Sequence, residues 1–134
     1  MVHGSRLITT LVLLVAGCGA PAPSPTPHPA LGGANATPLD LAVTVNGNGV
    51  GRLAPEGRDL TIDQPLPPLP WSVRAVTRSG RVIVTLDVPT DYQAGTYNAT
   101  DLSCGRVMIW VGNAPILGPP PPSGVSGVPG DCEP

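Results

Sequence analysis

Residues 71–88 read WSVRAVTR-SG-RVIVTLDV, and this stretch decides the fold class of the 134-residue chain. Two runs rich in β-branched residues flank Ser79-Gly80, a dipeptide typical of a tight turn. Arg74 and Arg78 fall on the face expected to meet solvent. The opposite face carries apolar residues at every second position, namely Trp71, Val73 and Ala75 before the turn and Val82, Val84, Leu86 and Val88 after it. The pattern predicts an antiparallel hairpin with one buried face.

Shorter apolar runs on both sides of this hairpin also predict strands. They cover residues 39–45, 50–53, 60–62 and 106–111, and a turn signal at Asn46-Gly47 separates the first two. Residues 65–70 read PLPPLP and lack four backbone donors, so we expect them to cross between sheets or follow an edge. Residues 89–101 are polar and predict a loop. The sequence therefore predicts an all-β fold, an antiparallel β-sandwich of about six or seven short strands or a small barrel.

The N-terminus shows the pattern expected of an export signal. Arg6 precedes an apolar stretch from Leu7 to Ala16, and Gly17 and Cys18 follow. Ten residues of helix span about 15 Å, too short for a bilayer core of about 30 Å, so a cleaved signal is expected over residues 1–17. An ordinary secretory signal, with Cys18 an incidental thiol, is the alternative.

The run Val15-Ala16-Gly17-Cys18 resembles the lipobox of bacterial lipoproteins. The resemblance implies that diacylglycerol is attached to Cys18, that residues 1–17 are removed, and that the protein is held on the extracytoplasmic face of a bacterial cell membrane. Residues 18–38 are rich in proline and alanine, so we expect a disordered, extended tether of up to roughly 60 Å. Residues 39–134 would form the β domain with a Pro/Gly-rich tail.

Residues 43–88 resemble, more loosely, PEGA-like and immunoglobulin-like extracytoplasmic modules. The shared pattern is Val45-Asn46-Gly47, then Ala54-Pro55, then Leu69-Pro70-Trp71 and the hairpin. The proline cluster of residues 65–70 departs from it, because it replaces a Pro-Gly pair. Such modules are generally not enzymes, so the resemblance implies a binding or structural role.

Composition excludes some partners. The seven basic residues are all arginine, and cleavage removes Arg6, which leaves six arginines against nine acids, a charge of −3. Because no basic block exists, we expect no nucleic-acid partner. Weak acidity also gives no attraction to anionic lipid, so membrane attachment would depend on acyl chains.

The other two cysteines predict a disulfide. With Cys18 acylated, Cys104 and Cys132 remain, 28 positions apart in an exported domain. A bond between them would hold the C-terminal tail against the last strand. Free thiols or an intermolecular bond are the alternative.

Residues for catalysis or metal binding are scarce. The two histidines are His3 and His28, in the signal and the tether, so the domain lacks the usual base and zinc ligand. We therefore predict no catalytic, cofactor or metal site and no enzyme activity. As alternatives, Asp87, Asp91 and Asp101 could bind calcium or act as an acid/base pair, if the fold brings them together.

The aromatic residues offer a further alternative. Trp71, Trp110, Tyr92 and Tyr97 are the only ones, and an exposed Trp–Tyr pair could stack on sugar rings, although a strand tryptophan usually lies in the core. Two tripeptides, Asn35-Ala36-Thr37 and Asn98-Ala99-Thr100, match the N-glycosylation acceptor pattern, which matters only in eukaryotic secretion. The sequence thus predicts a lipid-anchored, non-catalytic binding or structural module with an unidentified protein or glycan partner. A carbohydrate- or calcium-binding accessory module is the alternative.

Overall fold

The computed structural model describes Gly17 and residues 29–117 and 127–134, and within them the fold is all-β, as predicted. Every strand pair is antiparallel. No helix in these residues is long and apolar enough to span a bilayer. The eight strands are β1 (Leu31–Asn35), β2 (Leu41–Val45), β3 (Asn48–Leu53), β4 (Leu60–Ile62), β5 (Trp71–Val76), β6 (Val82–Val88), β7 (Tyr97–Leu102) and β8 (Gly105–Val111).

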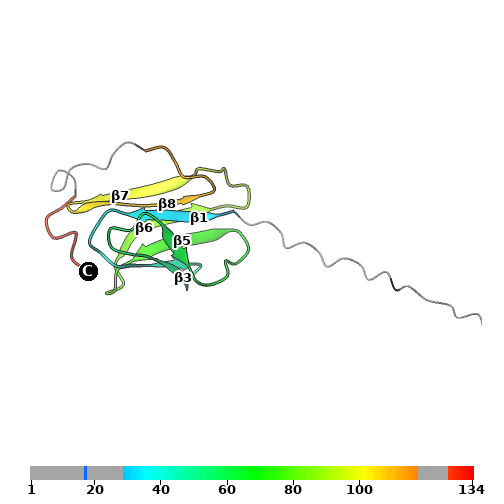
Figure 1. Cartoon of the computed structure of the whole chain (residues 1–134), viewed down its shortest axis with the longest axis horizontal. Helices are drawn as coiled ribbons and strands as arrows, with labels where there is room; N and C mark the ends of the chain where they lie inside the picture. The colour runs from blue at the N-terminus through cyan, green and yellow to red at the C-terminus, as the bar shows by residue number, and fades with distance from the viewer. Residues whose placement is uncertain (1–16, 18–28, 118–126) are drawn as a thin grey trace, which may run out of the picture.

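The strands form two stacked sheets, so the predicted sandwich is confirmed. One sheet has three strands in the order β1-β8-β7, and the other has five in the order β4-β3-β2-β5-β6. In Figure 1 the three-stranded sheet lies in the upper layer, over β3 and β5 of the five-stranded sheet. The core lies between the layers and consists of alternate side chains from both inner faces, among them Leu41, Val43, Val45, Leu53, Val73, Val107, Ile109 and Val111, none of them measurably exposed.

The central hairpin is present with one change of register. A bulge between Ala75 and Val76 pairs Ala75 with Val84 but Val76 with Val82. Val82 therefore points outward and is 45% exposed, while Ile83 is buried in its place. The prediction that Val82 shares the buried face is wrong, because the bulge shifts the alternation by one position at the start of the strand.

Two strands lie where the sequence predicts none. The predicted tether of residues 18–38 is wrong from Leu31 onward, since β1 pairs with β8 over all five of its residues. The predicted loop of residues 89–101 is wrong at its end, since β7 begins at Tyr97. Both strands are rich in small or polar residues, and their pairing with the apolar strand β8 holds them in the sheet.

The proline-rich segment joins two strands of one sheet. Residues 63–70 run from β4 to β5, passing over the β2–β3 turn, so the expected crossing between sheets is wrong. Trp71 is only 2% exposed and donates from Nε1 to the Pro67 carbonyl at 2.7 Å. Asn46, in the turn, accepts from Ser72 N at 2.8 Å and donates to the Pro70 carbonyl at 3.2 Å. Side-chain hydrogen bonds therefore hold the segment where prolines remove backbone donors.

Side chains also join the two sheets along one edge. Asn98 Nδ2 donates to the Thr85 carbonyl at 2.7 Å, and Thr100 Oγ1 donates to the Ile83 carbonyl at 2.8 Å. These bonds run from β7 to β6, which are edge strands of opposite sheets. They satisfy edge carbonyls that no neighbouring strand covers.

Candidate binding face

The residue with the clearest predicted role, Cys18, lies outside the described residues, and so do His3 and His28. The described domain consequently contains no histidine. The residues available for binding are thus the acids, the arginines and the aromatic side chains of the two sheets.

The three aspartates considered for calcium or catalysis lie apart. Asp87 is exposed on β6, where it pairs with Ser72 of the five-stranded sheet, and Asp91 is exposed in the following loop. Asp101 lies on β7 in the other sheet, and its carboxylate binds Arg106 Nε at 2.6 Å and Nη2 at 3.2 Å. Within the described part of the chain, no three His, Cys, Asp or Glu side chains are grouped to hold a metal ion.

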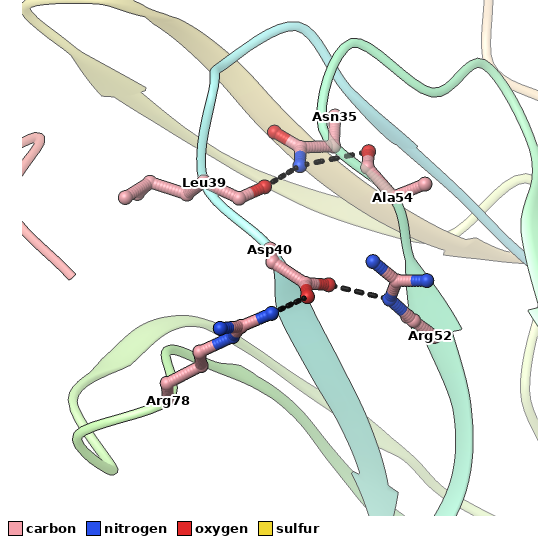
Figure 2. A network of polar contacts seen from close by, with 6 residues as sticks. All are labelled: Asn35, Leu39, Asp40, Arg52, Ala54 and Arg78. Atoms are coloured by element: carbon pink, nitrogen blue, oxygen red, sulfur yellow. Dashed lines mark hydrogen bonds and ion pairs between the residues drawn. The ribbon is translucent and has the colours of Figure 1, made fainter.

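Asp40 lies in the largest charged network. Its carboxylate binds Arg52 Nε at 2.5 Å and Arg78 Nη2 at 3.0 Å (Figure 2), and these hydrogen bonds lower the pKa of Asp40. A shallow hollow of about 290 Å³ lies beside this network, lined also by Asp63. Because Asp40 pairs with both arginines, the network joins the residue before β2 to β3 and to the β5–β6 turn.

Beside this network, a buried asparagine holds the end of β1. Asn35 is 1% exposed, and its Nδ2 donates to the carbonyls of Leu39 at 2.6 Å and Ala54 at 3.1 Å (Figure 2). Its Oδ1 accepts from Thr37 N at 3.0 Å and Thr37 Oγ1 at 2.6 Å. The acceptor-like tripeptide at Asn35 is therefore a structural element in the folded domain, with its amide enclosed.

Two hollows flank the proline-rich segment. One, of about 530 Å³, is lined mainly by apolar atoms of Pro70, Trp71, Val88 and Pro89, and the other, of about 640 Å³, lies between Asn48–Gly51 and residues 63–67. Both are open and shallow. Asn46 and Ser72 line the first hollow, and their hydrogen-bonding groups hold the proline-rich segment.

The aromatic residues divide into buried and exposed. Trp71 is in the core, and Tyr92 is partly buried against it. Tyr97 and Trp110, by contrast, are direct cross-strand partners on the outer face of the three-stranded sheet. Tyr97 is 46% exposed and Trp110 is half-buried. Directly opposed residues on one sheet face lie about 5 Å apart at Cβ, so both side chains leave the sheet on the same outer face.

Small residues surround this pair. A Cβ added to Gly32, the partner of Trp110 on β1, would stand 2.3 Å from the indole Nε1 and 2.4 Å from Cε2, so the indole lies over Gly32. The next row of the sheet pairs Ala99, Met108 and Ala34. We call the six outward positions Gly32, Ala34, Tyr97, Ala99, Met108 and Trp110 the aromatic face.

The paired charges of Asp101 and Arg106 form the next row. Hydrogen bonding to Arg106 lowers the pKa of Asp101, so the carboxylate stays ionised beside its partner. The sequence suggests a Trp–Tyr pair only as an alternative, because a tryptophan in a strand usually lies in the core. The length of the predicted loop, residues 89–101, could have indicated β7, because it leaves room for a strand before Gly105.

Comparison of this chain with protein-family models, curated proteins and solved structures gives no match.

Proposed function

We propose that this protein is a bacterial lipoprotein whose acylated Cys18 holds a non-catalytic, ligand-binding β domain on the extracytoplasmic face of the membrane. The observation that carries the proposal is the sequence order: a lipobox-like run ending at Cys18, a proline-rich stretch, and then a folded domain from β1 onward. The Cys104–Cys132 pair supports it, because disulfides persist in oxidising compartments outside the cytoplasm.

The start of β1 shortens the predicted tether. Residues 18–28 lie outside the described residues; the 11 steps from Cys18 to Pro29 would span about 34 Å if they kept the polyproline II spacing of about 3.1 Å per residue that their composition predicts. The domain would then lie close to the membrane surface. The aromatic face supports a binding role, because it groups solvent-facing aromatic side chains on one sheet.

Intact-mass spectrometry of the protein, produced in bacteria and recovered from each cell fraction, tests the anchor. We expect loss of residues 1–17 and added acyl mass in the membrane fraction. A Cys18→Ser control should lose both the acyl mass and membrane retention. An unmodified Cys18 in the native chain, or cleavage elsewhere, would sink the proposal.

A further inference from the structure

Beyond the anchor, we propose that the aromatic face binds the apolar face of an uncharged sugar ring in a glycan chain. This inference rests on the binding role proposed above and names its ligand class. It starts from geometry: the indole of Trp110 on β8 lies over Gly32 of β1, and Tyr97 presents an exposed ring from β7, on the other side of β8 and on the same face of the sheet. Sugar rings present C–H groups on one face, and these pack against aromatic rings held on one face of a rigid sheet.

The size of the face favours a small ligand. Strands rise about 3.4 Å per residue and lie about 4.8 Å apart, so Tyr97 to Asp101 covers about 14 Å and three strands cover about 10 Å. Specific protein interfaces bury about 800 Å² on each partner, several times this footprint. A short stretch of an extended glycan matches the area, whereas a folded protein partner would need surface beyond the sheet.

The charge of the face favours a neutral ligand. Of the outward positions of β1, β7 and β8, only Asp101 and Arg106 are charged, and they form an ion pair at 2.6 Å. No unpaired cation stands on these strands to attract phosphate or a polyanion. The ion pair is only partly buried, with side chains 35% and 23% exposed, so it presents polar atoms to ligand hydroxyl groups at one end of the face.

The position of the aromatic face is also consistent with a glycan ligand near the membrane. Ala30, immediately before β1, accepts a hydrogen bond from Gly112 N at 2.7 Å, so the chain joins the domain beside Trp110. With Cys18 as anchor, the face lies within the reach of the short tether, about 34 Å from the membrane. We commit to cell-wall glycan as the ligand source, because the proposed anchor places the domain on the extracytoplasmic side of the membrane, where the cell wall lies.

Fluorescence titration of the full-length protein, purified from whichever fraction holds it, tests the inference. The probes are purified peptidoglycan fragments and soluble chito-, cello- and manno-oligosaccharides. Trp71 is buried, so a change in emission reports Trp110. We expect binding by at least one probe, and a loss of at least about tenfold in affinity for Tyr97→Ala, which is about 1.4 kcal/mol. Because the face is neutral, raising the salt to 1 M should change the affinity less than twofold.

Val82→Ala is the matched control, because Val82 is equally exposed on the other sheet, and it should bind as the native protein does. Tyr97→Phe keeps the ring and should retain most of the affinity. Should none of the probes bind, or should Tyr97→Ala bind as tightly as the native protein, the glycan assignment is overturned. The two proposals can be tested separately. Glycan binding by a protein that is not acylated would contradict only the proposed lipid anchor, and acylation without glycan binding would contradict only the proposed ligand.

Discussion

At the residue scale, the most demanding position is Asn35. It is a polar side chain on the inner face of an edge strand, 1% exposed, and all its hydrogen-bonding groups have partners. Burying an amide costs free energy unless it is hydrogen-bonded, so the site works only because the loop after β1 and Ala54 supply carbonyls. The backbone adds a bond from Asn35 N to Gly57 O at 2.8 Å. Asn35 thus joins β1 to the β3–β4 turn across the sandwich.

We expect Asn35→Ala to lower the free energy of unfolding by about 2 to 4 kcal/mol, because it leaves the Leu39 and Ala54 carbonyls and Thr37 N without their partner. Urea unfolding followed by circular dichroism measures the change. Asn48→Ala is the control, since that side chain is exposed, and it should stay within about 0.5 kcal/mol of the native protein. If Asn35→Ala lowered the free energy of unfolding no more than Asn48→Ala does, the hydrogen bonds of Asn35 would not be stabilising the fold.

At the element scale, the C-terminal segment is held to the β7–β8 turn by several contacts at once. Cys104 and Cys132 lie at disulfide distance, as predicted, with their Cα atoms 6.0 Å apart. Asp131 accepts from Ser103 N at 3.0 Å and from Ser103 Oγ at 2.5 Å, and Arg81 donates to its carbonyl. The sequence predicts the cysteine pair but not the role of Asp131, because no local pattern marks a carboxylate that caps a distant turn.

Replacing both Cys104 and Cys132 with alanine should reduce the free energy of unfolding by about 3 to 4 kcal/mol, from the loop-closure entropy of a 28-residue separation. Urea unfolding with and without reductant measures this. Reduced native protein should match the double variant, and the variant should be insensitive to reductant. If reductant left the urea midpoint of the native protein unchanged, the Cys104–Cys132 bond would not be a stabilising one.

At the scale of the whole molecule, ionised carboxylates bind partners in both sheets and in the C-terminal segment. Arg52 and Arg78 lower the pKa of Asp40, hydrogen bonding to Arg106 lowers that of Asp101, and hydrogen bonds from Ser103 lower that of Asp131. A carboxylate with a depressed folded-state pKa stabilises the fold above its unfolded value, about 3.9 for aspartate. That stabilisation is lost as the pH falls through the folded pKa.

Thermal unfolding should therefore be measured from pH 7 to pH 2. We expect a midpoint temperature that is constant near neutral pH and that falls below about pH 4. Asp131→Asn should lower the midpoint temperature at pH 7. Because this variant lacks one of the ionised carboxylates, its midpoint temperature should then fall less than that of the native protein between pH 7 and pH 2. Asp91→Asn, at an exposed carboxylate in a loop, serves as the control and should follow the native curve. A native midpoint that stays constant down to pH 2 would rule out these ionised contacts as a source of stability.

The sequence alone determined the fold class and six of the strands, because alternation of apolar residues and turn signals such as Asn46-Gly47 act over a few neighbouring positions. The tertiary structure decided what depends on distant partners: β1 and β7, whose small and polar residues pair with β8, and the bulge that turns Val82 outward. The aromatic face belongs to this second group. Tyr97 and Trp110 become neighbours only through the β7–β8 register, and Gly32 leaves room for the indole from a strand nearly 80 residues earlier.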